Sequence, residues 1–246
     1  MRSEPTVFVE TAARLHFGVL DLRGGVGRWF GGLGASAPAP LLVISAERSE
    51  TLTAEGADAE RAAMFAARYL SHYQVPTTAR VTVHHGLPPH SGLGSGTQLA
   101  LAVARALAEL HGHSTDVRVL ARAVGRARRS AVGTWTFADG GFVVEGGRQR
   151  ESDACGPLVA RLPLPREWRC VVAVPDAVEP GLSGAAEEAV FASLPPPSER
   201  DVEKVARLVN SVITEAPGRV RPIREQLADT REQVPEPTPS FYDPGV

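Results

Sequence analysis

Leu87-Pro-Pro-His-Ser-Gly-Leu-Gly-Ser-Gly-Thr-Gln-Leu99 is the segment of this chain that says most about its chemistry. It separates a predicted strand, residues 79–85, from a predicted helix rich in alanine and leucine, residues 97–110. Glycine lacks a Cβ atom, so a loop built from it can bring its backbone close to a ligand. The first N–H groups of a helix have no partner within the helix and carry a partial positive charge. Strand, glycine-rich loop and helix start together predict a phosphate-binding site.

Neither of the two common glycine signatures describes this loop. A Walker A loop requires Gly-Lys-Ser/Thr, and the loop has no lysine. The dinucleotide pattern G-x-G-x-x-G is matched only in its first half, Gly92-Leu93-Gly94. The candidate phosphate or substrate contacts in the segment are His90, Gly92, Leu93, Gly94, Ser95, Gly96, Thr97 and Gln98.

The loop resembles the phosphate-binding motif of the GHMP kinase superfamily, in which a proline-rich segment precedes Gly-Leu-Gly-Ser-Ser. Here Gly96-Thr97-Gln98 follows the first serine. That variant is similar to one branch of the superfamily, the β-ribofuranosylaminobenzene 5′-phosphate synthases. Two further segments resemble the same branch: ARLHFGVLDL from residue 13, continuing to residue 34, and RRSAVG from residue 128, continuing to FADGGFVVEGG at residues 137–147. The resemblance covers roughly residues 6–208.

The resemblance implies an α+β fold of two layers, GHMP-kinase-like. Its N-terminal half resembles ribosomal protein S5, its C-terminal half is ferredoxin-like, and the ligand lies between them. Strands and helices that do not alternate strictly also favour an α+β fold. We therefore expect a ligand-binding domain at residues 1–150, an incomplete C-terminal domain at 151–216 and a proline-rich, disordered tail at 217–246.

Hydrophobic periodicity and turn residues predict the individual elements. We expect strands at residues 6–17, 41–46, 80–84 and 168–174, and a glycine-rich loop over the ligand at residues 24–34, ended by Pro38 and Pro40. We expect helices at residues 58–73, 97–110, 184–193 and 198–215, and one capped by Thr115 or Asp116 that reaches about residue 129. Residues 134–145 read as a hairpin that turns at Asp139-Gly140-Gly141.

The resemblance also implies a reaction. Enzymes of this branch join phosphoribosyl pyrophosphate to a 4-substituted benzoate and release pyrophosphate and carbon dioxide, in methanopterin biosynthesis. This chemistry needs help for the departing pyrophosphate, usually from Mg²⁺ and arginine, and a ring held against the anomeric carbon. Both 4-aminobenzoate and 4-hydroxybenzoate stay open as the aromatic substrate. A homodimer is expected from the family alone.

Four residues near the N-terminus are candidates for this chemistry. The resemblance ties the positions of Asp21 and Arg28 to phosphoribosyl pyrophosphate. We hypothesise that Asp21 contacts Mg²⁺ or the developing positive ribosyl centre, and that Arg28 binds pyrophosphate or carboxylate. In the plainer interpretation, Asp21 caps a turn and Arg28 is solvated. Arg14 and His16 lie two residues apart on a predicted strand and share a face, Arg14 toward phosphate and His16 toward substrate or in a structural role.

Asp139 is a second acidic candidate for substrate or metal, with Gly140 and Gly141 as substrate contacts, unless the three form an ordinary turn. Arg126, Arg128 and Arg129 end a predicted helix, where cations are favoured by the helix dipole in any case.

Composition restricts the other functions. The net charge is −2, so nucleic acid is not an expected partner. No apolar run is long enough for a membrane span and no signal peptide is visible, so we expect a cytoplasmic protein. Lys204 is the only lysine, which leaves arginine, backbone N–H groups or a metal to hold phosphate. Two alternatives stay open: an ATP-dependent small-molecule kinase of the GHMP family, and a truncated, inactive relative that binds a phosphorylated ligand.

Overall fold

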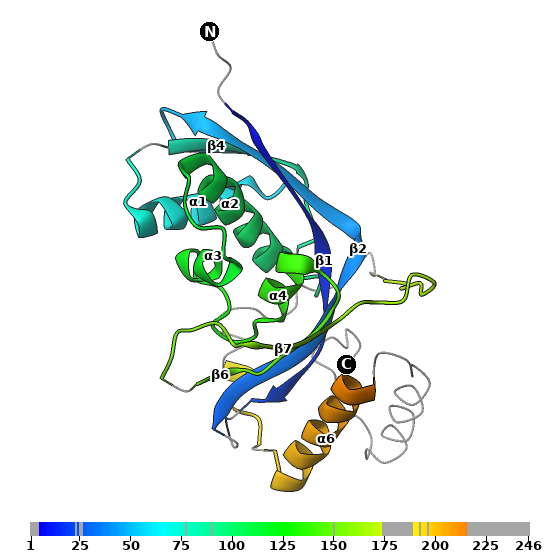
Figure 1. Ribbon diagram of the computed structural model, residues 1–246. Helices are drawn as coiled ribbons and strands as arrows, with labels where there is room; N and C mark the ends of the chain where they lie inside the picture. Colours follow the sequence, from blue (N-terminus) through cyan, green and yellow to red (C-terminus); the bar gives the residue numbers. More distant parts are fainter. Residues whose placement is uncertain are drawn as a thin grey trace.

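The computed structural model describes residues 5–22, 24, 27–76, 78–89, 91–149, 151–173, 189–191, 193–195 and 197–215. Within them, one mixed sheet is covered on one face by four helices (Figure 1). The strands are β1 (Val7–Asp21), β2 (Arg28–Ser49), β3 (Thr53–Gly56), β4 (Thr78–His85), β5 (Phe142–Glu145), β6 (Arg148–Gln149) and β7 (Leu158–Leu162). The helices are α1 (Ala59–Tyr73), α2 (Ser95–His111), α3 (Val117–Ala123), α4 (Val132–Asp139) and α6 (Glu199–Glu215).

The long strand β2 organises the sheet. Strand β1 pairs with it antiparallel along nearly its whole length. The other edge of β2 is shared, since β5 pairs with residues 32–35 and β4 pairs with residues 43–49. Helix α1 lies against β3 and β4, α2 packs on β1 and β2, and α4 contacts β1, β2 and β5.

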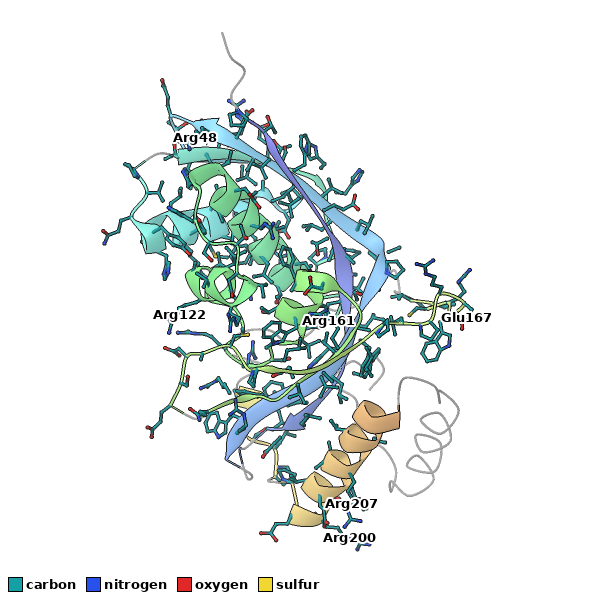
Figure 2. The ribbon with its side chains drawn as sticks, in the orientation of Figure 1. Arg48, Arg122, Arg161, Glu167, Arg200 and Arg207 are labelled. Atoms are coloured by element: carbon teal, nitrogen blue, oxygen red, sulfur yellow. The ribbon has the colours of Figure 1, made fainter. Side chains whose placement is uncertain are left out.

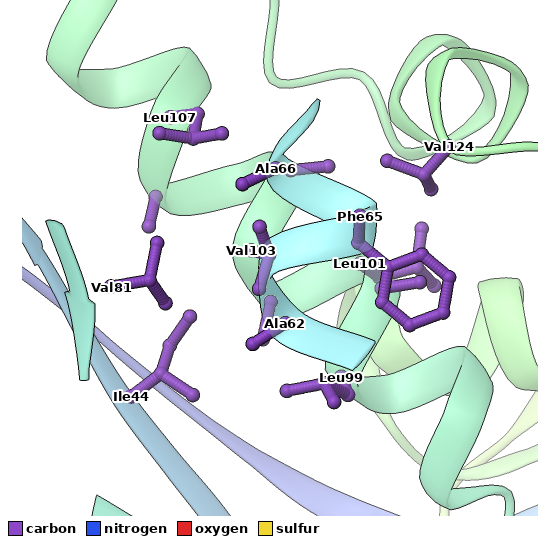
Figure 3. Close-up of a cluster of buried hydrophobic side chains, with 14 of the residues drawn as sticks. Ile44, Ala62, Phe65, Ala66, Val81, Leu99, Leu101, Val103, Leu107 and Val124 are labelled. Carbon is purple, nitrogen blue, oxygen red and sulfur yellow. The ribbon is translucent and has the colours of Figure 1, made fainter. Parts of the chain in front are cut away.

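Helix α2 is the centre of the hydrophobic core, because its alanines let neighbouring elements approach closely. Phe65 of α1, Leu101 and Leu107 of α2, and Val124 after α3 are all fully buried in this cluster (Figure 3). Each such large side chain contributes about 1.5–3 kcal/mol when fully buried. The core thus fixes the start of α2, and with it the glycine-rich loop.

Several expected elements are confirmed. The strands expected at residues 6–17 and 80–84 correspond to β1 and β4, and the helices expected at 58–73, 97–110 and 198–215 correspond to α1, α2 and α6. Asp116 caps α3 through a bond from the backbone N–H of Arg118. The helix ends at Ala123 rather than near residue 129, since Gly125 and Ala127 have positive φ angles. The helix expected at 184–193 lies mostly outside the described residues, and the tail at 217–246 lies entirely outside them.

The expected glycine-rich loop at residues 24–34 is wrong from Arg28 onward, where the chain forms β2. Gly34 shows the reason. A Cβ atom there would overlap the carbonyl oxygen of Leu15 on β1 and a methyl group of Val132 on α4. The glycine permits close packing of a helix on two strands rather than loop movement.

Pro38 and Pro40 do not break this strand, as was expected, because β1 has a register shift opposite them. Ala12 pairs with Leu41, and the next residue, Ala13, pairs with Ala37. Residues 38–40 therefore bulge between two paired segments, and the missing proline N–H groups remove no bond from the ladder.

Two further expectations are wrong. Residues 134–145 form the end of α4 followed by β5, not a hairpin, because the contacts of α4 with β1, β2 and β5 override the local preference of Trp135 and Phe137 for strands. Residues 168–173 are not in a strand: Val171 is 91% exposed, whereas the neighbouring Val172 packs against the core. Among the residues with described positions, no helix is long and apolar enough to cross a membrane.

Candidate active site

The glycine-rich loop ends at the N-terminus of α2. Gly94, with φ 76°, is the residue before the helix, and its carbonyl oxygen accepts bonds from the N–H groups of Thr97 (2.9 Å) and Gln98 (3.0 Å). Within the described part of the chain, the N–H groups of Ser95 and Gly96 have no acceptor. Two backbone donors at the positive end of the helix are therefore left for a ligand or water.

Arg14 holds the loop against β1. Its N–H group donates to the carbonyl oxygen of Leu93 (3.0 Å), and its guanidinium Nη1 donates to that of Gly92 (3.4 Å). A Cβ atom on Gly94 would lie 3.3 Å from Cβ of Arg14, which is tighter than ordinary packing. The structure thus places Arg14 beside the predicted phosphate loop, where it supports the loop backbone.

Two other arginines reach the same helix start from different elements. Nη atoms of Arg61, on α1, and of Arg126, after α3, would each lie 3.2 Å from a Cβ atom on Gly96. Arg61 is ion-paired with Asp58, and it also donates to Oγ of Ser95 (3.4 Å). Sequence reasoning did not select Arg61, because nothing in its helical pattern distinguishes it from a solvated arginine.

Arg126 carries positive charge that the protein does not balance. In the part of the chain that the structure describes, its guanidinium has no hydrogen-bond or ion-pair partner, and its Nε atom is buried. The guanidinium lies 4.8 Å from the ring centre of Phe65. Burial, with Arg68, Arg61 and Arg129 nearby, lowers the pKa of Arg126 to about 10, so the group stays charged at neutral pH. A bound anion would relieve this repulsion.

Gln98 and Thr97 position the helix. The side chain of Gln98, 1% exposed, accepts a bond from Oγ1 of Thr11 (2.9 Å) and donates to the carbonyl oxygen of Gly133 (3.1 Å). The methyl group of Thr97 packs against Gly133. Their expected contact with a ligand stays a prediction, whereas their structural role is clear: they join α2 to β1 and α4.

Asp21 and Arg28 lie at one end of the β1–β2 pair. Asp21 is 4% exposed, and its Oδ1 atom accepts a bond from the N–H of Gly24 (2.8 Å), which is the turn-capping geometry considered above. Arg28 is not solvated. Its Nε atom donates to the carbonyl oxygen of Gly146 (2.7 Å) and its Nη2 atom to that of Gly147 (2.7 Å).

His16 is partly buried and lies on the same side of β1 as Arg14. Burial, followed by the charge of Arg14, lowers the pKa of His16 to about 4, so the imidazole is neutral at pH 7. Its Nε2 atom is 3.3 Å from Oγ of Ser130. A neutral ring offers one donor and one acceptor nitrogen.

Asp139, Gly140 and Gly141 form the end of α4, where Arg161 of β7 reaches them (Figure 2). Asp139 is 75% exposed and 3.5 Å from Arg161. Gly141 exchanges bonds with Ser36 (2.9 and 3.0 Å). Asp21 pairs with Phe30 of β2, and Ser36 lies six residues further along that strand, which corresponds to about 20 Å. The structure therefore does not bring the two predicted aspartates together.

The described residues contain no group of three or more histidine, cysteine or acidic side chains that could hold a metal ion. Asp21 is a single carboxylate with one oxygen engaged by the backbone. Mg²⁺ is often bound through one or two carboxylates together with substrate phosphates, and Mg²⁺ at Asp21 stays a prediction. His90 lies outside the described residues.

Glu145 is the buried group that sequence reasoning missed. It is fully buried at the end of β5. Its Oε1 atom accepts bonds from the N–H of Ala131 (3.1 Å) and from Oγ of Ser130 (3.2 Å), and its Oε2 atom accepts one from the N–H of Gly147 (2.8 Å). The only signal in the sequence is a single acid that ends an apolar run, FVVE.

Comparison with known proteins identifies the family and the fold. Residues 59–147 match the family model described as the GHMP kinases N terminal domain. The chain is 36% identical over 224 residues to beta-ribofuranosylphenol 5'-phosphate synthase of Methanothermobacter thermautotrophicus, covering 82% of this chain and 68% of that protein. It is 33% identical over 213 residues to the protein of the same name from Archaeoglobus fulgidus, covering 82% and 67%.

Solved structures share the fold at low identity. Streptococcus pneumoniae phosphomevalonate kinase, in complex with phosphomevalonate and AMPPNP, aligns with a TM-score of 0.60 and 13% identity over 90% of this chain and 78% of that chain. Homoserine kinase from Cytophaga hutchinsonii aligns with a TM-score of 0.53 and 15% identity, over 87% and 68%. The GHMP-kinase-like α+β fold expected from the sequence is confirmed. The boundaries expected at residues 150 and 216 stay predictions.

Proposed function

Because the chain belongs to the β-ribofuranosylphenol 5′-phosphate synthase family, on the GHMP kinase fold, we propose that it is a decarboxylating phosphoribosyltransferase. Its substrates would be phosphoribosyl pyrophosphate and a 4-substituted benzoate. The observation that carries the proposal on this chain is the unbalanced charge of Arg126 beside two unused backbone donors at the start of α2. That combination calls for an anion of high charge, such as a phosphate or diphosphate.

The 5′-phosphate end of the substrate would lie over Ser95 and Gly96, where Arg61 and Arg126 converge, and its diphosphate would extend along β1 toward Asp21. Each hydrogen bond to a charged phosphate oxygen contributes about 1.5–3 kcal/mol. Arginine suits this role since its planar fork can donate two parallel bonds to one phosphate group. In this proposal, the arginine pair takes the place that a lysine has in a Walker A loop.

In the reaction, the bond between the anomeric carbon and the diphosphate oxygen breaks, and its electron pair leaves with pyrophosphate. The ring carbon that carries the carboxylate bonds to the anomeric carbon, and loss of carbon dioxide returns the electron pair to the ring. Asp21 would hold Mg²⁺ at the diphosphate end of the substrate, where the ion would supply positive charge for the leaving group. Arg28 would hold the benzoate carboxylate or pyrophosphate once a ligand competes with its present backbone acceptors.

The names of the curated relatives contain phenol, and a phenol product arises from 4-hydroxybenzoate. This supports 4-hydroxybenzoate for the chain, with 4-aminobenzoate as the second candidate. A homodimer and a cytoplasmic location stay predictions.

The second candidate function is an ATP-dependent kinase, because the solved kinases share the fold and a kinase would use the same loop.

An exchange of Asp21 for asparagine distinguishes catalysis from turn capping. The amide oxygen of Asp21→Asn can still accept the bond from Gly24, so stability should stay within about 1 kcal/mol. Turnover of phosphoribosyl pyrophosphate should fall at least about tenfold. Wild-type turnover in this variant would remove Asp21 from the mechanism.

A further inference from the structure

We propose that Glu145 is a positioning residue that connects Arg28 to His16, fixing the guanidinium of one and the tautomer of the other. The inference rests on the proposed function, because these are two of its candidate catalytic side chains. Glu145 itself is fully buried and acts only through its neighbours.

The first connection runs through the turn between β5 and β6. Oε2 of Glu145 accepts the bond from the N–H of Gly147 (2.8 Å). The carbonyl oxygens of Gly146 and Gly147, on the same turn, accept the bonds from Arg28 (2.7 Å each). The carboxylate and the guanidinium thus hold one short turn from two sides, so a shift of Gly147 would displace Arg28.

The second connection runs through Ser130. Its Oγ atom donates to Oε1 of Glu145 (3.2 Å), accepts from the N–H of Val132 (3.2 Å) and lies 3.3 Å from Nε2 of His16. A hydroxyl group has one proton, and a bond to a carboxylate is the stronger use of it. Nε2 of His16 must then be the donor toward Oγ. This leaves Nδ1 of His16 as a hydrogen-bond acceptor in the neutral ring.

A carboxylate is required because donors face both of its oxygens. Glutamine has the same shape but only one oxygen, so Glu145→Gln must give up one connection. If the amide nitrogen faces Gly147, the two N–H groups repel each other and the turn that holds Arg28 loses its support. If the amide nitrogen faces Ser130, it also meets the N–H of Ala131. It then donates to Oγ, and the serine proton turns to Nε2 of His16, which inverts the tautomer. Burial raises the pKa of Glu145, whereas the three bonds and the charge of Arg28 oppose that shift.

The test is ¹⁵N NMR of the free protein at pH 7, on the wild type and on Glu145→Gln, with His16 identified from its loss in His16→Asn. We expect His16 in the Nε2–H tautomer and a slowly exchanging Nε–H on Arg28 in the wild type. In Glu145→Gln, either the tautomer should invert or the Arg28 proton should exchange at least tenfold faster. A wild-type Nδ1–H tautomer, or a variant in which neither signal moves, would overturn the proposal.

Ser130→Ala provides a second test in case Glu145→Gln does not fold. It should shift the His16 signals and leave Arg28 protected, and unmoved His16 signals would contradict the second connection. Thr136→Ala is the matched control, since it removes the hydroxyl bonds within α4 to the carbonyl oxygens of Val132 (3.0 Å) and Gly133 (3.2 Å) but none of the bonds of Glu145, Ser130 or Arg28. Both NMR readouts need no substrate, so they stand even if the protein fails to turn over phosphoribosyl pyrophosphate. With turnover, kcat should fall about 10- to 100-fold in Glu145→Gln and stay near wild type in Thr136→Ala.

Discussion

Exchange of His16 for glutamine should remove a pH-dependent part of the stability of the protein. Burial and the charge of Arg14 lower the pKa of His16 from its ordinary 6.5 to about 4. Between these two values the unfolded chain binds a proton that the folded protein does not, so the free energy of unfolding decreases as the pH falls through this range. At about 1.4 kcal/mol per pH unit, the full effect is about 3 kcal/mol.

Urea unfolding followed by circular dichroism, at about pH 7.5 and about pH 4.5, measures this effect. The free energy of unfolding of the wild type should fall by about 2.5 kcal/mol more than that of His16→Gln over this interval. His111, whose pKa is also lowered by burial, contributes in the same direction to both proteins and cancels in the difference. Equal pH dependence in the two proteins would refute the argument that His16 is held neutral.

Three further exchanges test the fold and the anion site. Gly34→Ala should lower the free energy of unfolding by several kcal/mol, because the added methyl group would overlap a β1 carbonyl oxygen. Gly18→Ala is the control: its methyl group would enter open space and should cost less than about 1 kcal/mol. Chemical denaturation compares the two variants. Gln98→Ala should cost about 1–3 kcal/mol in the same assay, since it removes the buried acceptor of the Thr11 hydroxyl and one of the donors to the carbonyl oxygen of Gly133. Arg126→Gln should weaken binding of inorganic pyrophosphate at least about tenfold, as measured by calorimetry. Arg122→Gln, at an exposed position, is the control and should bind pyrophosphate as the wild type does. If Arg126→Gln also binds pyrophosphate as the wild type does, Arg126 is not part of the site.

The sequence predicts the parts of this molecule that depend on local signals. The loop before α2, the helix itself and the strand before it follow from residue spacing and from glycine at defined positions. The resemblance of three motifs to the GHMP kinase superfamily predicted the overall fold. The glycines of β2 were misread because their role is close packing against β1 and α4, and contacts of that kind cannot be seen in a local window.

The site was predicted less completely, because its side chains come from separate elements. Arg61 and Arg126 meet only because α1 and the end of α3 both pack beside the start of α2. Glu145 contacts residues 14 positions before it and two after it, and it reaches Arg28 only through a turn. Asp139 looked equivalent to Asp21 in sequence, yet it ends α4, and the nearby Gly141 bonds to Ser36 of β2, whereas Asp21 pairs with Phe30 of β2.

Turnover with phosphoribosyl pyrophosphate, Mg²⁺ and either 4-hydroxybenzoate or 4-aminobenzoate tests the central claim most directly, with carbon dioxide and pyrophosphate followed together. We expect stoichiometric release of both from the wild type, with a strong loss in Arg126→Gln. A folded protein that releases neither product, or that instead transfers phosphate from ATP to a small molecule, would contradict the assignment.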